Sequence, residues 1–268
     1  PTHYGDETCH VNGIDYARRI VISCLQSRMQ RLGLFYDRRF DVNPPRENYQ
    51  PKFDFTSSHS LALARVRPDD RLLILGSGSA DLVRPFRDRA KSVIAVELDQ
   101  DPAIAALGVE VHTADLNTCD LARIVGGRRV TRVLLLDVIE HLADPEAFME
   151  RLRVVPGLED AEVMITTPNI AFLPMRLMLL LGQFNYGRRG ILDRTHTRLF
   201  TFASLRTLLL QQGFDVGKLE GIPAPFPLAL GRASALGRVL LRANELALRV
   251  LRGLFSFQIL ATARPRPT

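Results

Sequence analysis

The sequence predicts an α/β fold in which helices sandwich a mainly parallel sheet of seven strands. Two observations predict it: short segments rich in Val, Ile and Leu alternate with helix-like stretches after about residue 60, and glycines directly follow the first segment. Strands that are apolar throughout are typical of a parallel sheet buried on both faces. With 268 residues, 46% of them hydrophobic, the chain is long enough to bury such a core.

Five segments are predicted to form the parallel strands, and two later segments are predicted to extend one edge of the sheet. The five are RLLILG (71–76), SVIAVEL (92–98), VEVHTAD (109–115), RVLLLDV (132–138) and EVMITTP (162–168). The two later segments are GFDVGKLEG (213–221) and SFQILATARP (256–265).

A helical lead-in of residues 1–40 is predicted before the sheet domain of residues 41–268. Apolar residues recur in it at helical spacing, and the prolines of DVNPPRENYQP (41–51) end the pattern. The apolar positions are Ile14, Ala17, Val21, Cys24 and Leu25.

Residues 233–253 predict a basic amphipathic helix near the other end of the chain. Arg238, Arg242 and Arg249 fall on one helical face, and leucine, valine and alanine occupy the others. From Gly221 onward the chain carries seven arginines and one glutamate, so this stretch accounts for the net charge of +6. Two interpretations stay open: the helix lies on an anionic membrane surface, or it packs over a ligand pocket.

Composition excludes several classes of protein. The three cysteines form no CxxC pair, which argues against a disulfide framework or a zinc site and favours a cytoplasmic protein. The longest apolar stretch, 170–181, contains Pro174 and Arg176 and is shorter than the roughly 20 residues that span a bilayer. Without tryptophan or a basic stripe interleaved with aromatics, nucleic-acid binding is not expected. The opening PTHYGDE has no initiator methionine, so we interpret the chain as part of a longer protein.

The turn formed by Gly76, Ser77 and Gly78 lets the backbone approach a ligand at the start of a helix. It resembles the start of a dinucleotide fingerprint, but Asp81 stands where that fingerprint needs a small residue. A carboxylate there also repels a pyrophosphate, so NAD is disfavoured.

Three carboxylates are predicted at the carboxyl ends of consecutive strands. Glu97 lies about 20 residues after the glycine turn, where an acid accepts hydrogen bonds from ribose hydroxyls, and Asp115 and Asp137 end the next two strands. These ends of the strands line the crevice where open α/β sheets bind ligands. Three negative charges suit a cationic nucleoside better than an anionic phosphate chain.

The segments LLILGSGSADL, VIAVELD, TADLN and LLLDVIEHLADPEAFMERL resemble successive motifs of class I S-adenosylmethionine-dependent methyltransferases, over about residues 56–265. The resemblance implies a Rossmann-like fold and S-adenosylmethionine as cofactor. It places Gly76, Ser77 and Gly78 at the methionine part, Glu97 with its neighbour Leu98 at the ribose, Asp115 and Leu116 at the adenine, and Asp137 and Val138 beneath the reactive methyl.

Two residues depart from that family's pattern. Ile74 replaces an acid two residues before the first glycine, and Ala80 replaces a third glycine. An alternative therefore stays open, in which the domain is a degenerate, non-catalytic module that binds glycan or scaffolds a glycosyltransferase. A nicotinamide-dependent sugar oxidoreductase is disfavoured, because Asp81 interrupts the fingerprint and no Tyr-x-x-x-Lys pair is present.

A second resemblance concerns the start of the chain. PTHYGDETCHVNGIDYA (1–17) and QRLGLFYDRRFDV (30–42) resemble the tail of an inverting, nucleotide-sugar-dependent glycosyltransferase fused to such methyltransferases. This implies an upstream glycosyltransferase domain and a glycan or lipid-linked sugar as acceptor. The other reading is an ordinary helical lid over the methyltransferase pocket.

Two histidines are candidates for the chemistry of an oxygen methyltransferase. His196, in ILDRTHTRLFT, is the preferred general base, because its segment resembles the family's substrate-side loop. His141, in DVIEHLADP, is either a second catalytic residue or an anchor for the turn. No metal site is expected from these histidines and the acids. Phe55, Ser58 and His59 are predicted to form a loop that closes over the cofactor.

Overall fold

The computed structural model describes residues 12–31, 37–40 and 51–267. The resemblance to a glycosyltransferase tail rests largely on residues 1–11, 32–36 and 41–42, which lie outside these ranges. Within the described residues, no helix has the length and apolarity needed to cross a membrane.

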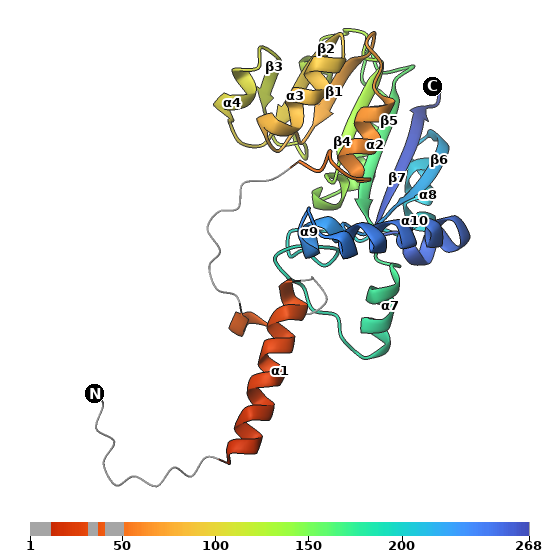
Figure 1. Cartoon of the computed structure of the whole chain (residues 1–268). Helices are drawn as coiled ribbons and strands as arrows, with labels where there is room; N and C mark the ends of the chain where they lie inside the picture. The colour runs from red at the N-terminus through yellow and green to blue at the C-terminus, as the bar shows by residue number, and fades with distance from the viewer. Residues whose placement is uncertain (1–11, 32–36, 41–50, 268) are drawn as a thin grey trace.

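A seven-stranded sheet in the order β3-β2-β1-β4-β5-β7-β6 forms the centre of the molecule (Figure 1). Strands β1 to β5 are parallel, and β7 runs antiparallel to both β5 and β6. This confirms the predicted seven-stranded, mainly parallel sheet with two late strands at one edge. The strands are β1 (Arg71–Leu75), β2 (Ser92–Glu97), β3 (Glu110–Thr113), β4 (Arg132–Leu136), β5 (Glu162–Pro168), β6 (Phe214–Ile222) and β7 (Gln258–Pro265).

Helices cover both faces of the sheet, and each face has its own apolar core. The alternation of side chains along β1 sends Leu73 and Leu75 to one core and Leu72 and Ile74 to the other. The first core is closed by α5 (Leu121–Val125), α6 (Pro145–Arg153) and α8 (Phe202–Gln211). The second core is closed by α2 (Ser58–Arg65), α3 (Ala80–Arg89) and α4 (Pro102–Ala105). Burial on both faces explains why the central strands are mostly apolar along their length, as in residues 72–75 of β1 and 133–136 of β4.

Local sequence signals determine where the covering helices begin. Ser79 accepts a hydrogen bond from Leu82 N–H at the start of α3, and Asp144 accepts one from Ala147 N–H at the start of α6, where Pro145 follows. The remaining helices are α1 (Gly13–Arg31), η1 (Arg38–Phe40), η2 (Ile139–His141), α7 (Leu173–Leu180), α9 (Phe226–Leu230) and α10 (Ala235–Phe255).

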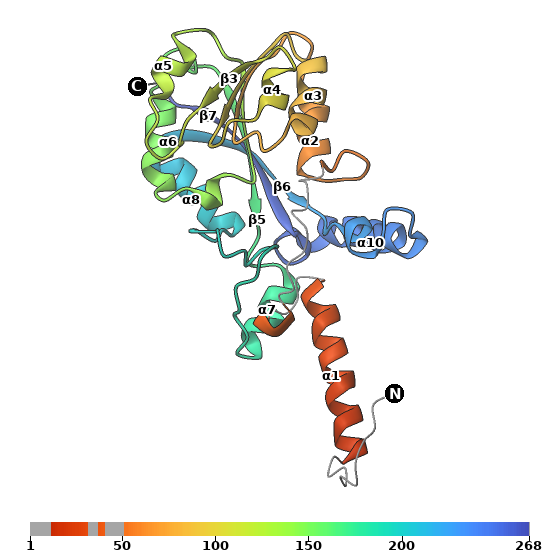
Figure 2. The same ribbon diagram turned by 90° about the vertical axis from the view of Figure 1, so that its left-hand side faces the viewer.

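Helix α1 confirms the helical part of the predicted lead-in, and it extends away from the sheet in both views (Figures 1 and 2). Its apolar positions Ile14, Val21 and Leu25 are exposed to solvent. Helix α10 confirms the helix predicted at 233–253, with a kink at Leu251, and it packs against α9 and β6.

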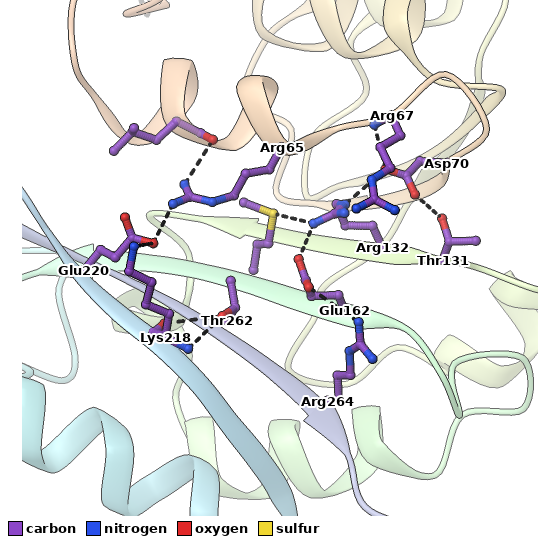
Figure 3. A network of polar contacts seen from close by, with 12 residues as sticks. Arg65, Arg67, Asp70, Thr131, Arg132, Glu162, Lys218, Glu220, Thr262 and Arg264 are labelled. Atoms are coloured by element: carbon purple, nitrogen blue, oxygen red, sulfur yellow. Dashed lines mark hydrogen bonds and ion pairs between the residues drawn. The ribbon is translucent and has the colours of Figure 1, made fainter.

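The amino ends of the strands hold a polar network centred on Arg132, the first residue of β4 (Figure 3). Its guanidinium donates to Asp70 over 3.2 Å and to Glu162, and both Arg132 and Asp70 are buried. Asp70 also accepts from Thr131 Oγ1 at 2.8 Å and from Arg67 N–H at 2.8 Å. Every charge in the buried part of this network therefore has a partner.

Candidate active site

The predicted site residues gather where the strand order reverses. Strand β1 pairs with β2 on one side and with β4 on the other, so the crevice above their carboxyl ends is the switch point of the sheet. The glycine turn, Glu97 and Asp137 follow or end these three strands.

The glycine turn uses backbone conformations that L side chains rarely adopt. Gly76 has φ of +74° and Gly78 has φ of +68°. A Cβ atom on Gly76 would lie 2.6 Å from Cγ2 of Val138, so the turn packs directly against the residue after Asp137. The sequence placed this turn and Val138 in the same site, and in the structure the two are in direct contact.

Glu97 ties the end of β2 to the glycine turn. Its Oε2 accepts from Ser77 Oγ at 2.9 Å and from Gly78 N–H, while the side chain of Leu98 is exposed. A carboxylate oxygen has two lone pairs, so Glu97 retains capacity for further donors such as hydroxyls. It shapes the turn as well as facing the crevice.

Asp115 and Leu116 lie after β3 and differ in environment. Asp115 is exposed, and its Oδ1 accepts from the backbone and side-chain amides of Asn117 at 2.9 and 2.8 Å. The side chain of Leu116 is buried in the first core, and its carbonyl oxygen accepts from Arg151 at 3.0 Å. The predicted adenine contacts of both residues stay predictions.

Asp137 is the one described non-glycine residue with a left-handed backbone, at φ of +59°. Its Oδ1 accepts from Thr166 Oγ1 at 2.8 Å and from Gln258 Nε2 at 2.7 Å, and Ser58 Oγ lies 3.4 Å from Oδ2. A non-glycine residue adopts such a backbone only where surrounding contacts hold it, and the contacts with Thr166, Gln258 and Ser58 do so for Asp137. Sequence reasoning did not find Thr166 or Gln258, because their partner lies far away along the chain.

His59 packs beneath this cluster as a buried, neutral imidazole. Its Nδ1 accepts from Lys52 N–H at 3.0 Å. Burial lowers the pKa of His59 to about 4, against the opposing charge of Asp137. Ser58 and His59 are therefore packed against the site, and closure of their loop over a cofactor stays a prediction.

The structure brings the two predicted catalytic histidines together. The ring centroids of His141 and His196 lie 4.8 Å apart, edge to face. The loop that carries His196 is held on η2, because Glu140 O accepts from Thr197 N–H at 2.8 Å and from Arg198 N–H at 3.2 Å. Burial lowers the pKa of His196, and the nearby His141 lowers it further.

Each ring of this pair has a defined orientation. Nδ1 of His196 lies 2.9 Å from Ile191 O, and Nδ1 of His141 lies 3.2 Å from Thr195 O. A carbonyl oxygen only accepts, so each Nδ1 carries the hydrogen and each Nε2 keeps its lone pair. The pair can therefore accept a proton or bind an electron-poor centre.

Glu140 lies beside the histidines and was not assigned a role from the sequence. Its side chain is 1% exposed, and neither carboxylate oxygen has a hydrogen-bond partner within the described part of the chain. Burial raises the pKa of Glu140 well above its ordinary value, and the charge of Asp137 adds to this. In the sequence, the only feature that could have identified Glu140 is its position directly before His141. The burial of its side chain is not visible in the sequence.

Ile74 and Ala80, the two departures from the methyltransferase pattern, lie in regular secondary structure beside the glycine turn. Ile74 is buried in the second core with Phe86 and Ala62, and Ala80 is the first residue of α3. Asp81 is exposed in the first turn of that helix. The substitution at position 74 thus supports packing of the strand, and Ile74 does not point into the crevice.

Two cavities, of about 350 and 540 Å³, open at the amino ends of the strands. Their walls include Gly157 and Glu159 in one case and Arg71, Arg87 and Arg128 in the other. None of the predicted site residues lines them. Since ligands of open α/β sheets bind at the opposite, carboxyl ends, we assign the chemistry to the crevice.

Comparisons with known proteins identify the family of this chain. A family described as a methyltransferase domain matches residues 45–219. A search of curated proteins found no match.

Solved structures similar to this chain include three with different assigned roles. The small RNA methyltransferase HEN1 gives a TM-score of 0.54 at 17% identity, over 85% of this chain and 28% of that chain. The [4+2]-cyclase SpnF gives 0.51 at 15% identity, over 84% and 85%. A candidate methyltransferase from Bacillus halodurans C-125 gives 0.50 at 17% identity, over 77% and 97%. At these identities the similarity shows the fold.

Proposed function

The chain belongs to the family of methyltransferase domains, and on that premise we propose that it methylates a hydroxyl oxygen of a sugar, glycan or lipid-linked small molecule. Membership of this family makes the protein an enzyme and S-adenosylmethionine its expected cofactor. The family does not specify the acceptor, so transfer to oxygen and the chemical class of the acceptor are what we propose.

The residues of the crevice fit this cofactor. The left-handed glycines turn the backbone into the start of α3, where the first N–H groups have no partner within the helix. Glu97, Asp115 and Asp137 end or follow strands β2, β3 and β4 at their carboxyl ends, and negative charge there would favour a sulfonium cation. When bound, S-adenosylmethionine supplies a methyl group that is already activated for displacement.

The His141–His196 pair is the observation that carries the choice of an oxygen acceptor. Five residues, 137–141, connect the crevice to the pair, and Val138 within them touches the glycine turn. In the proposed step, Nε2 of His196 takes the proton of the acceptor hydroxyl. The oxygen forms its bond to the methyl carbon as the carbon–sulfur bond breaks, and that electron pair stays on sulfur.

Alignment is the larger contribution of the protein to such a displacement. Holding both reactants in line is worth roughly 7–11 kcal/mol, whereas a general base adds about 10²–10⁴-fold in rate. The backbone hydrogen bonds that Thr197 and Arg198 N–H donate to Glu140 O fix the pair for this purpose.

Calorimetry with S-adenosylmethionine, S-adenosylhomocysteine and NAD tests the cofactor assignment. We expect the first two to bind and NAD not to bind. Failure of both nucleosides to bind would favour the alternative of a degenerate module, and binding of NAD alone would favour an oxidoreductase.

Transfer of labelled methyl groups to a panel of hydroxylated sugars, with and without a lipid carrier, tests the acceptor. His196→Gln should bind the cofactor normally and lose at least about 100-fold in turnover. His112→Gln, which removes a histidine on β3 beside Glu110, is the matched control. Equal turnover in both variants would refute the role of His196.

We also propose that α10 rests on an anionic membrane surface, where a lipid-linked acceptor and an upstream glycosyltransferase would meet the crevice. One side of α10 packs on α9 and β6, but a second side exposes Leu236, Val239, Leu246 and Val250, and Arg238, Arg242 and Arg249 lie next to that stripe. Exposed leucines flanked by arginines suit the boundary between headgroups and acyl chains.

Flotation with vesicles that contain or lack phosphatidylglycerol tests this contact. The chain should float with anionic vesicles only, and the double variant Arg238→Gln, Arg249→Gln should float less. The control is Arg84→Gln, Arg206→Gln, which removes two exposed arginines from α3 and α8. Binding that is independent of vesicle charge, or equal loss in both variants, would contradict the proposal.

A further inference from the structure

We propose that Glu140, His141 and His196 bind one divalent transition-metal ion. The ligand atoms of the three side chains all lie within 4.8 Å of one another. They come from η2 and from a loop more than 50 residues further along the chain. No metal was expected here from the sequence, because nothing in the sequence places position 196 beside position 140.

The carboxylate of Glu140 is the strongest indication that the cluster takes a cation. Its oxygens are buried and make no hydrogen bond of normal geometry with a described residue, and the hydroxyl of Thr167, the neighbour that favours its charged form, is itself buried without a partner. Buried carboxylates in proteins are normally paired or hydrogen-bonded. The oxygens lie at the histidine pair, where an ion bound by the imidazoles would be within reach. A cation there supplies the partner that the protein itself does not.

The two imidazoles are oriented as metal ligands usually are. Each Nδ1–H is directed at a backbone carbonyl oxygen, from Thr195 for His141 and from Ile191 for His196. Metal-bound histidines almost always donate their other N–H in this way, which fixes the ring and the tautomer. Nε2 of each ring is left as a nitrogen donor toward the cluster.

The backbone holds the two halves of the cluster together before any ion binds. Three hydrogen bonds from Thr197 and Arg198 end on the carbonyl oxygen of Glu140 itself. The ligands of a four-coordinate ion lie about 3.4 Å apart when each bond is about 2.1 Å, so the side chains need to move by about an ångström. His141 is exposed and can make that rotation without disturbing the core.

Two imidazole nitrogens and one carboxylate oxygen favour zinc, cobalt, iron or manganese over magnesium, which prefers oxygen ligands. Three protein ligands leave a coordination position for a small molecule. The catalytic use of that position rests on the proposed function: with an ion bound, Nε2 of His196 would be a ligand in place of the proton acceptor, and the ion would lower the pKa of the acceptor hydroxyl so that its proton passes to water. Ion binding itself does not depend on the proposed function.

Titration of the chelator-treated, full-length chain with Co²⁺, Zn²⁺ and Mg²⁺ tests the site without any methyl transfer. We expect one equivalent of Co²⁺ to bind, with the visible absorption bands of a low-coordinate site, and Zn²⁺ to displace it. Mg²⁺ should bind at least about tenfold more weakly than Co²⁺.

Variants locate the binding. Glu140→Gln and His196→Gln should each weaken Co²⁺ binding at least about tenfold, while His112→Gln, which alters the other described histidine beside a glutamate, should not. Circular dichroism confirms that each variant is folded. Absence of Co²⁺ binding, a preference for Mg²⁺, or unchanged binding in both cluster variants would overturn the inference.

Failure of this inference is distinguishable from failure of the proposed function. A metal-free chain that binds S-adenosylmethionine and methylates at full rate keeps the proposed function and overturns the metal site. A chain that binds Co²⁺ through Glu140 and His196 but never binds S-adenosylmethionine keeps the metal site and overturns the proposed function.

Discussion

The two ends of the central sheet treat buried charge in opposite ways. At the amino ends, Arg132 is surrounded by Asp70 and Glu162, and Asp70 also accepts from Thr131 (Figure 3). At the carboxyl ends, Glu140 is buried more deeply than these residues, and neither of its carboxylate oxygens makes a hydrogen bond of normal geometry in the described structure. Both ends are formed by the same strands and differ only in which residues the chain places there.

The difference separates stability from function. A buried charge with all its partners is costly to remove one member at a time, because the remaining member stays buried and unpaired. A buried carboxyl group that lacks hydrogen-bond partners costs stability in the folded protein, and such groups are found preferentially at functional sites. The amino ends therefore hold the fold together, and the carboxyl ends hold the groups to which we assign the proposed chemistry.

The largest effect is expected from breaking the paired end. Arg132→Met should lower the free energy of unfolding by about 3–5 kcal/mol, because Asp70 and Glu162 lose their buried cation. Denaturant unfolding measures it. Arg264→Met, which removes an exposed arginine 3.8 Å from Glu162, should cost less than about 1 kcal/mol, and equal losses would contradict the comparison.

Acid should weaken the opposite end through His59. Because its pKa is about 4 in the folded protein and near 6.5 when unfolded, the unfolded chain binds more protons between these values. The stabilisation is present above pH 6.5 and is lost as the pH falls toward 4, amounting to roughly 3 kcal/mol. Unfolding curves between pH 4 and 7 should show a shallower pH dependence for His59→Gln. An unchanged slope would refute the buried, neutral imidazole.

A smaller effect is expected from Gly76→Ala. The added Cβ would meet Val138 at 2.6 Å, and φ of +74° disfavours a side chain, so stability should fall by about 1–3 kcal/mol. Affinity for S-adenosylmethionine should fall as well. The double variant Gly76→Ala, Val138→Ala relieves the contact but not the backbone strain, so only part of the loss should return. Full affinity in the single variant would contradict the role of this turn.

The smallest effect has the opposite sign. Glu140→Leu removes a buried carboxylate without partners, so the metal-free protein should gain about 1 kcal/mol in stability while it loses ion binding. Chemical denaturation in the presence of a chelator measures the gain. A loss of several kcal/mol would mean that Glu140 is paired after all, and the contrast between the two ends would fail.

Much of the fold was predictable because local pattern and burial agree there. Each predicted strand is present, since a residue run such as Leu72–Leu75 has no polar position to direct toward solvent. The two late strands β6 and β7 were predicted from their β character, but their antiparallel pairing and the position of β7 between β5 and β6 follow from the tertiary path of the chain. Ile74 was read as a possible defect of the site, whereas the structure places it in the core.

By itself, the sequence determined the alternation of strands and helices, the glycine turn at Gly76 and Gly78, and the acids that end three strands, because these depend on short-range pattern and on the rule that parallel strands end at one edge. Only the tertiary structure decided that Glu140 is buried without a donor and that His196 lies beside His141. The reason is physical: burial and proximity between distant segments arise from packing of the whole chain, and no local periodicity encodes them.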